Sequence, residues 1–377
     1  MTTESDVLAA LSAVKDPEIG QPITDLGMVK SVAVEGAHVT VTILLTISGC
    51  PMRNEITTRV EGAVRPLAGV SDVTVVLDVM NDEQRTTMRT KLRGSEAREI
   101  PFTQPGSLTQ ILAIASGKGG VGKSSVTANL AVALAARGLS VGLLDADVYG
   151  HSIPRMLGVH AGPTNVDGLI LPPVGHGVKT MSILPMKPGG VAQPVAYRGP
   201  MLHKVLEQFL ADVWWGDLDF LLLDLPPGTG DMAISVAQLL PHAKLIVVTT
   251  PQIAAAEVAV RAGMMAEITK QQVGGVIENM SGFPCPHCGE PMDLFGRGGG
   301  DLVAEQLTKS LGTSVPVLGR IPFDVRLREG GDNGQPLVTA VPDAHASLEL
   351  LAIAEALSSK PRGLVGQSLG LSPSRKN

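Results

Sequence analysis

The first 80 residues alternate between hydrophobic and polar positions as in a small sheet with helices packed on it. Within 38–47, valine, isoleucine and leucine at the odd positions from 39 alternate mainly with threonine, which is the pattern of a half-buried strand. Glu35-Gly36-Ala37 supplies a turn between this strand and the preceding one. The pattern predicts helices over 4–15 and 51–67 and strands over 28–34, 38–47 and 73–79. Together these elements predict a small α+β domain over residues 1–80.

From residue 108 onward the apolar runs are short and unbroken, as expected of strands buried on both faces of a sheet. Helical stretches separate several of these runs, and the longest spans 252–270. Short apolar strands that alternate with helices indicate an α/β fold with a doubly wound, mainly parallel sheet, which we predict over 108–357. The predicted strands are Ile111–Ala115, Val141–Asp145, Phe220–Asp224, Leu245–Thr249, Gly275–Asn279 and Val317–Ile321.

Two segments lack such a pattern. Residues 81–107 are charged and contain glycine and proline, and we predict a partly flexible linker there. Residues 358–377 are rich in Ser, Gly, Pro and basic residues, and we predict a disordered tail.

Composition narrows the function classes. The chain has 30 basic and 36 acidic residues among 377, which argues against broad affinity for nucleic acids or anionic membranes. No apolar run approaches the ~18–20 residues of a membrane span, and the start of the chain lacks the basic region of a secretion signal. The cysteines are few and odd in number: Cys50, Cys285 and Cys288. We therefore expect a cytoplasmic protein whose cysteines serve metal or redox chemistry, with no nucleic-acid or membrane partner.

The segment 116–125 carries the most specific motif, because Gly117 to Ser124 satisfies G-x-x-x-x-G-K-[ST] between a predicted strand and a predicted helix. Backbone N–H groups of such a loop surround phosphate oxygens, Lys123 reaches the β- and γ-phosphates, and Ser124 binds Mg²⁺. The motif predicts that the chain binds a nucleoside triphosphate together with Mg²⁺. The predicted nucleotide-binding residues of the loop are Gly117, Lys118, Gly119, Gly120, Val121, Gly122, Lys123, Ser124 and Ser125.

Aspartates end two of the predicted strands. Asp145 and Asp147 follow one strand and Asp224 ends another, and the carboxyl ends of parallel strands line the crevice where ligands bind. Asp224 is the candidate magnesium ligand, and Asp147 is the candidate for positioning the attacking water. The role of Asp145 stays open between the two.

Cys285 and Cys288 form a C-x-x-C pair before a glycine. The residues that follow, Gly289-Glu290-Pro291, disfavour the helix of a thioredoxin-like redox site. Zinc and iron–sulfur sites both commonly use four thiolates, so two chains facing each other across a symmetry axis would complete either. Ligand number alone does not separate the two metals, and unligated thiols are a further alternative.

The loop GKGGVGKS, with DADVYG at 145–150 and DLPPGTGD at 224–231, resembles the deviant-Walker ATPases that include septum-placing, plasmid-partitioning and nitrogenase iron proteins. In that group a signature lysine, here Lys118, reaches the partner subunit's nucleotide. The resemblance therefore implies a homodimeric ATPase in which Lys118, Lys123 and Asp147 are catalytic. It also implies that Asn279 contacts the adenine, with the segment 321–324 nearby.

Three longer motifs, DVYGHSIPRMLG at 147–158, ENMSGFPCPHCG at 278–289 and GRIPFD at 319–324, are similar to the Mrp/ApbC branch, the iron–sulfur cluster carrier ATPases. The similarity covers about 108–357. It implies that the cysteine pairs of two subunits bridge a [4Fe–4S] cluster that is passed to apoprotein clients, with a cluster-assembly scaffold as a further partner.

The amino-terminal domain resembles the small iron–sulfur assembly domain that often precedes Mrp proteins, through DPEI at 16–19, TDLG at 24–27 and TISGCP at 46–51. Cys50 falls before a predicted helix, where the helix N-terminus would favour its thiolate. We take Cys50 as a candidate cluster ligand or client contact, and the alternative is a small packed hydrophobe.

Two rival functions share parts of this pattern. A positioning ATPase of the septum-placing or plasmid-partitioning kind, with a structural zinc site, needs a basic surface or an amphipathic terminal helix, and the tail offers neither. An ATP-gated electron donor needs a dedicated redox partner. We therefore expect ATP-dependent binding and transfer of iron–sulfur clusters.

Overall fold

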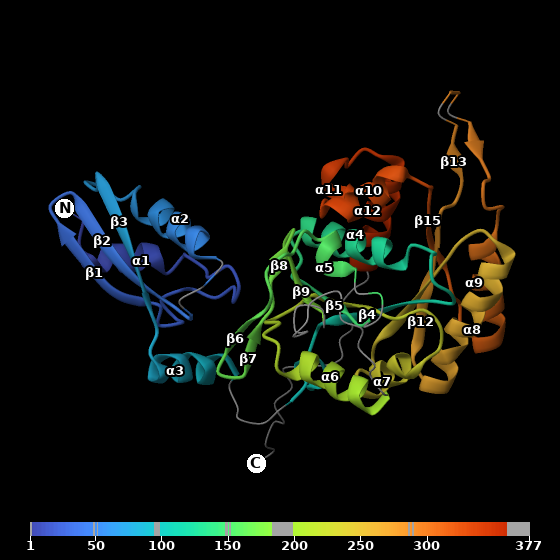
Figure 1. Ribbon diagram of the computed structural model, residues 1–377, viewed down its shortest axis with the longest axis horizontal. Helices are drawn as coiled ribbons and strands as arrows, with labels where there is room; N and C mark the ends of the chain where they lie inside the picture. The colour runs from blue at the N-terminus through green and yellow to red at the C-terminus, as the bar shows by residue number, and fades with distance from the viewer. Residues whose placement is uncertain are drawn as a thin grey trace, which may run out of the picture. The chain divides into compact units, whose positions relative to one another are not determined.

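The computed structural model describes residues 2–47, 50, 52–93, 99–147, 150, 152–182, 199–285, 287–288 and 290–359. These residues form two compact units (Figure 1). Unit 1 contains 1–99 together with 161–174 and 212–216. Unit 2 contains 100–160, 175–211 and 217–377. Residues 360–377, most of the predicted tail, lie outside the described residues.

Unit 1 contains the predicted small sheet, in the order β1 (Val29–Glu35), β2 (His38–Leu45) and β3 (Asp72–Val79). β1 and β2 form an antiparallel hairpin, whereas β2 and β3 are parallel because the helix α2 (Arg53–Val64) connects them. The first helix, α1 (Glu4–Leu11), begins at a capping box between Thr3 and Asp6. The α+β fold expected from the alternation of residues is confirmed.

The predicted linker is wrong over the helix α3 (Asp82–Arg93). Met88 and Leu92 of this helix are buried in the core of unit 1. Arg85 and Arg89 contact Asp167, in the turn between β6 (Thr164–Val166) and β7 (Leu169–Leu171). The high charge of this segment belongs to the exposed face of a helix, which is why it resembled a linker.

Unit 2 is built on an eight-stranded sheet in the order β15-β12-β11-β4-β10-β5-β9-β8. All six predicted strands are present and pair in parallel. Two short strands were not predicted, because β8 and β9 lack a long apolar run. The bounds are β4 (Gln110–Ser116), β5 (Val141–Asp145), β8 (Val174–Gly175), β9 (Val178–Ser182), β10 (Phe220–Asp224), β11 (Lys244–Thr249), β12 (Gln272–Asn279) and β15 (Val317–Ile321).

Helices cover both faces of this sheet, and the doubly wound fold is confirmed (Figure 1). β4 is buried at every position after Gln110 because it lies in the middle of the sheet. The helices of unit 2 are η1 (Pro101–Thr103, a 3-10 helix), α4 (Lys123–Ala136), α5 (Ile153–Met156), α6 (Gly199–Ala211), α7 (Asp231–Leu239), α8 (Ile253–Thr269), α9 (Gly299–Leu311), α10 (Val325–Asn333), α11 (Leu337–Ala340) and α12 (His345–Ser358). None of the helices in the described ranges is long and apolar enough to cross a membrane.

Candidate functional site

The phosphate loop lies between β4 and α4, at the carboxyl edge of the sheet. Gly120 and Gly122 have φ values of 81° and 79°, in the left-handed region that favours glycine. Gly117 has no room for a side chain, because an added Cβ would lie 2.3 Å from the backbone carbon of Val258 in α8. The loop therefore needs its glycines both for conformation and for packing.

Lys123 and Asp224 form a buried ion pair at this loop, with 2.7 Å between Nζ and Oδ1. Asp224 is fully buried and its two carboxylate oxygens also accept hydrogen bonds from Ser124 Oγ (2.6 Å) and Thr127 Oγ1 (2.9 Å). The side chains of Ser124 and Asp224 thus present adjacent oxygen atoms, the donor type that Mg²⁺ prefers, so these residues fit a magnesium ion. Lys123 lies beside them and is oriented by the carboxylate.

Asp145 and Asp147 have different environments. Burial, reinforced by the charge of Asp224, raises the pKa of Asp145 to about 8. Asp145 accepts hydrogen bonds from the backbone N–H groups of Asp147 and Ile153, so it fixes the segment that follows β5. Asp147 is only partly buried, and its Oδ1 accepts from Gly150 N at 2.9 Å. This arrangement favours a supporting role for Asp145 and leaves Asp147 as the residue closer to solvent.

Lys118 is partly exposed and its Nζ donates a hydrogen bond to Gln252 Oε1 at 3.3 Å. Gln252 is the N-cap residue of α8, so the lysine lies across the loop from the start of that helix. This partner is a neutral side chain, and a single hydrogen bond of this length is easily exchanged. A role for Lys118 in a second subunit stays a prediction.

The cysteine pair lies on a hairpin formed by β13 (Phe283–Pro284) and β14 (Pro291–Met292), which projects from unit 2 in Figure 1. Cys285 is partly buried, Cys288 is exposed, and neither forms a disulfide. Backbone hydrogen bonds from Cys288 and then His287 lower the pKa of Cys285, which favours its thiolate. Pro286 and Gly289 of the motif lie outside the described residues.

Three aromatic rings hold the base of this hairpin. Phe323 packs against Phe283 and Phe295, with ring centroids 5.7 and 6.0 Å apart. The backbone N–H of Phe323 donates to Gly282 O, and that of Ser281 donates to Ile321 O, each at 2.8 Å. The sequence suggested that the segment 321–324 lies near the adenine. In the structure this segment contacts the residues at the start of the thiol hairpin.

Asn279, the predicted adenine contact, is buried at the end of β12 with 2 % of its surface exposed. Its side-chain amide donates a hydrogen bond to Val121 O of the phosphate loop at 2.9 Å. The structure therefore brings Asn279 to the nucleotide loop. A contact with adenine stays a prediction.

Cys50 is buried in the core of unit 1, with 5 % of its surface exposed. Burial raises the pKa of its thiol, and the nearby carboxyls Glu18 and Asp16 act in the same direction. The prediction that a helix N-terminus favours its thiolate is wrong here, because desolvation of the charged form is the larger effect. A role for Cys50 in cluster binding or client contact stays a prediction.

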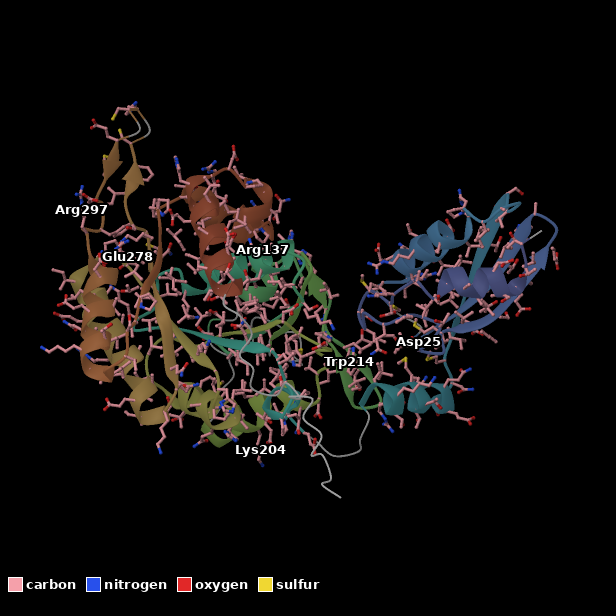
Figure 2. All side chains as sticks on the ribbon, turned by 180° about the vertical axis from the view of Figure 1, so that it is seen from behind. Asp25, Arg137, Lys204, Trp214, Glu278 and Arg297 are labelled. Atoms are coloured by element: carbon pink, nitrogen blue, oxygen red, sulfur yellow. The ribbon has the colours of Figure 1, made fainter. Side chains whose placement is uncertain are left out.

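Glu18 is a buried carboxyl that the sequence did not single out, although it belongs to the DPEI motif. It is 7 % exposed, and Thr164 Oγ1 donates to its Oε1 at 3.4 Å. The neighbouring carbonyl of Ile19 accepts a hydrogen bond from Trp214 Nε1 at 3.0 Å. Two segments that follow the phosphate loop in sequence thus complete unit 1 around this motif, and Figure 2 labels Trp214 there.

Replacing Glu18 with glutamine is expected to change how the stability of unit 1 depends on pH. Burial raises the pKa of Glu18 from 4.5 to about 7, so the folded state binds more protons than the unfolded state between these values. Stability therefore falls as pH rises from 4.5 to about 7, and this loss stays in place at higher pH. Glu18→Gln should remove it, stabilising unit 1 at pH 8 by up to about 3 kcal/mol.

The measurement is denaturant unfolding followed by tryptophan fluorescence, because both tryptophans of the chain, Trp214 and Trp215, lie in unit 1. Asp25→Asn is the matched control, since Asp25 is an exposed carboxyl of the same unit (Figure 2). A pH profile that is the same in Glu18→Gln as in the unchanged protein would contradict the prediction.

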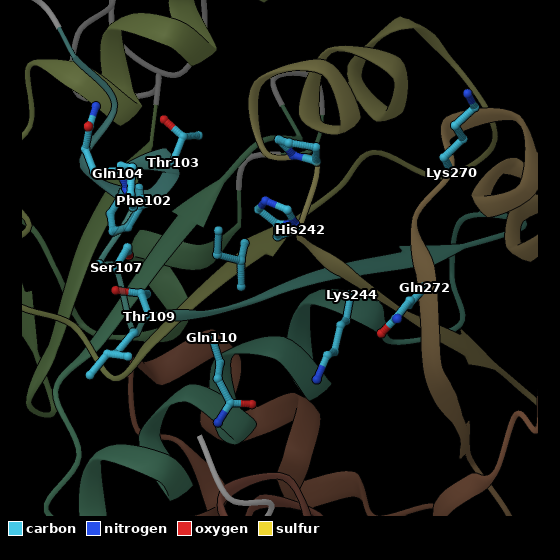
Figure 3. Close-up of a pocket in the computed structure, with 15 residues that line it drawn as sticks. Phe102, Thr103, Gln104, Ser107, Thr109, Gln110, His242, Lys244, Lys270 and Gln272 are labelled. Atoms are coloured by element: carbon cyan, nitrogen blue, oxygen red, sulfur yellow. The ribbon is translucent and has the colours of Figure 1, made fainter. Parts of the chain in front are cut away.

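Unit 2 also contains a cavity of about 670 Å³ at the opposite edge of the sheet (Figure 3). Gln110, Lys244 and Gln272, the first residues of β4, β11 and β12, line it together with the loop 102–109. Because the phosphate loop follows the carboxyl end of β4, this cavity is separate from the nucleotide site.

Residues 107–358 match the family model described as a NUBPL iron-transfer P-loop NTPase. The chain belongs to this family. Residues 4–77 match a second model, described as an iron–sulfur cluster assembly protein. Family membership agrees with the site geometry, in which a phosphate loop and a thiol hairpin occur in one unit, and the resemblance to carrier ATPases seen in the sequence is confirmed.

Curated relatives in this family are similar over nearly the whole chain. The iron–sulfur cluster carrier protein of Mycobacterium tuberculosis is 58 % identical over 373 residues, covering 98 % of this chain and 97 % of the relative. The protein of the same name from Synechocystis is 40 % identical, covering 96 % and 98 %. These names favour the carrier function over a positioning ATPase.

Among solved structures, a nucleotide-binding protein from Archaeoglobus fulgidus in complex with ADP is 36 % identical, with a TM-score of 0.51. The similarity covers 68 % of this chain and 92 % of the Archaeoglobus chain. The likeness supports the family assignment of the P-loop unit.

Proposed function

We propose that this P-loop NTPase is a carrier that binds a [4Fe–4S] cluster and transfers it to apoproteins, using ATP binding and hydrolysis. The observation that carries the proposal is the combination, within unit 2, of the ordered Lys123–Asp224–Ser124 group and an accessible, disulfide-free cysteine pair on a projecting hairpin. The cluster is the cargo. Apoprotein clients and a cluster-assembly scaffold are the proposed partners, in the cytoplasm.

The number of ligands supports a homodimer. In the described ranges no group of three or more His, Cys, Asp and Glu side chains is arranged to hold a metal ion. Two thiolates from one chain satisfy half of a four-thiolate site, and a second copy of the same hairpin would supply the other half across a two-fold axis. A cluster shared in this way is bound only while the two hairpins face each other, which suits a cargo that must be released.

Each residue of the nucleotide site has a proposed role. Backbone N–H groups of the loop bind phosphate oxygens, Lys123 neutralises the β- and γ-phosphates, and Ser124 and Asp224 hold Mg²⁺, which offsets phosphate charge. Asp147 orients the attacking water. Lys118 extends to the partner's nucleotide and stabilises the charge of the transition state.

Anaerobic reconstitution of the full chain with iron and sulfide tests the proposal. We expect about four iron and four sulfide per two chains, a visible charge-transfer absorbance, and a dimer in size-exclusion chromatography. The loaded protein should then activate an apoprotein that requires a [4Fe–4S] cluster. Stoichiometric zinc with no iron uptake, or a loaded protein that remains a monomer, would overturn the proposal.

Replacing Cys50 with alanine is expected to lower the rate of cluster transfer while the bridged cluster stays bound. The cluster should stay bound because Cys50 is in unit 1, whereas the proposed cluster ligands are on the hairpin of unit 2. Transfer should slow because the proposed role of Cys50 is to contact the cluster or the client during transfer. Transfer is followed by activation of the apoprotein and retention by absorbance. If transfer proceeds at the unchanged rate, Cys50 has no part in it.

A further inference from the structure

The end of β12 contacts both the phosphate loop and the thiol hairpin. Asn279, its last residue, donates its side-chain amide to Val121 O in the loop. The next residue, Met280, has a φ of 60°, and the chain turns there into the segment that leads to Cys285. Three residues, 280–282, therefore separate Asn279, which bonds to the nucleotide loop, from β13, the strand that leads to Cys285.

The adjacent residue, Glu278, holds the other end of the hairpin segment. Its carboxylate is buried and accepts hydrogen bonds from Gly300 N in the first turn of α9 and from Ser281 Oγ, each at 2.6 Å. Both ends of the segment 281–300 are thus hydrogen-bonded to the side chain of Glu278, the residue before Asn279 in β12. A displacement of this strand end would move the hairpin as a whole.

The hydrogen bond from Asn279 ends on a peptide group that is suited to sense phosphate. No described peptide bond is cis, so the carbonyl of Val121 and the N–H of Gly122 lie in one peptide plane and point in opposite directions. Asn279 takes the carbonyl side. Backbone N–H groups of this loop are the phosphate ligands, and an anion on the N–H side polarises the carbonyl and strengthens the bond on the other side.

Space at this position is closely limited. A Cβ added to Gly122 would lie 2.3 Å from Asn279 Nδ2, so the amide packs directly on the loop. Gly122 itself is in the left-handed region, where its conformation depends on the loop as a whole. A movement of the loop on nucleotide binding therefore displaces the Asn279 side chain, because no space separates the two.

We propose that Asn279 is a positioning residue that couples the nucleotide in the phosphate loop to the position of the thiol hairpin. This deepens the proposed function and rests on it for its biological meaning. The coupling is reciprocal. If bound nucleotide changes the affinity of the thiols for their ligand by a given factor, that ligand changes the affinity for nucleotide by the same factor.

The test uses the cluster-free protein, so that it does not depend on cluster transfer. Alkylation rates of Cys285 and Cys288 are measured by peptide mass spectrometry with and without ADP or a non-hydrolysable ATP analogue. We expect nucleotide to change these rates by about fivefold or more in the unchanged protein. In Asn279→Ala the ratio should fall to about one at ADP concentrations that saturate the variant, for which the Kd for ADP is measured separately.

Asn129→Ala is the matched control. Asn129 is also buried, and its amide donates to Ser125 O at 2.9 Å beside the same loop, but its Oδ1 accepts from Val338 N in α11. This variant also loses a buried amide bond near the loop but should keep the nucleotide effect on the thiols. Equal loss in both variants would indicate general damage to the loop and would overturn the proposal.

Two further results would overturn it. One is no effect of nucleotide on the thiols of the unchanged protein at saturating ADP. The other is an Asn279→Ala protein that keeps the thiol effect but loses its preference for ADP over GDP, since that assigns Asn279 to the base alone. Failure of the carrier function would look different: nucleotide would still control the thiols, but no cluster would be bound.

Discussion

Mixing Lys118→Ala chains with Lys123→Ala chains is expected to restore ATP hydrolysis that neither variant has alone. A Lys118→Ala chain keeps its own phosphate site but gives no lysine to its partner. A Lys123→Ala chain has a defective site but still carries Lys118. In a mixed dimer one site is complete, because the cation that stabilises its transition state comes from the other chain.

The expected size of the effect is large. Loss of a cation delivered in trans lowers hydrolysis by about 10³-fold or more in comparable enzymes, so each variant alone should be nearly inactive. Random pairing makes half of the dimers mixed, each with one working site, so an equal mixture should recover about a quarter of the unchanged rate. Phosphate release at saturating ATP measures this.

The control is a mixture of Lys118→Ala with the double variant Lys118→Ala/Lys123→Ala, in which no chain donates a lysine. It should stay inactive. If the first mixture also stays inactive although the chains pair, Lys118 acts within its own chain. The position in which Lys118 donates to Gln252 would then be the one it occupies during catalysis.

Replacing either Cys285 or Cys288 with serine is expected to abolish stable cluster binding. In the proposed homodimer each substitution acts twice, because a dimer of variant chains loses two of four thiolates. Serine is nearly the same size but is a much weaker ligand for iron than a thiolate. Iron content and visible absorbance after anaerobic reconstitution should fall to the level of a protein without cluster, while ADP affinity is kept.

Cys50→Ser is the comparison for this experiment, because it removes the remaining cysteine of the chain but should leave the bridged cluster intact. Cluster binding that survives in Cys285→Ser and Cys288→Ser, or is lost only with Cys50, would move the site to unit 1. Retained ADP affinity separates loss of a ligand from loss of the fold.

Much of the nucleotide site was accessible from the sequence. The phosphate loop is a contiguous motif, and its function depends on backbone geometry that glycines specify locally. The aspartates were predicted to converge because they end strands of a parallel sheet, and Asp224 does meet Ser124 and Lys123. The sequence left the role of Asp145 open, since the burial that distinguishes it from Asp147 comes from the tertiary fold.

The sequence by itself determined the α/β fold, the nucleotide loop and the paired thiols, because each depends on periodicity or on residues close together in the chain. Only the tertiary structure decided three things: that α3 packs into unit 1, that Glu18 and Cys50 are buried together there, and that Asn279 contacts the phosphate loop. These depend on solvent exclusion and on contacts between distant segments. The pKa of a buried thiol or carboxyl is set by its surroundings, which the local sequence does not contain.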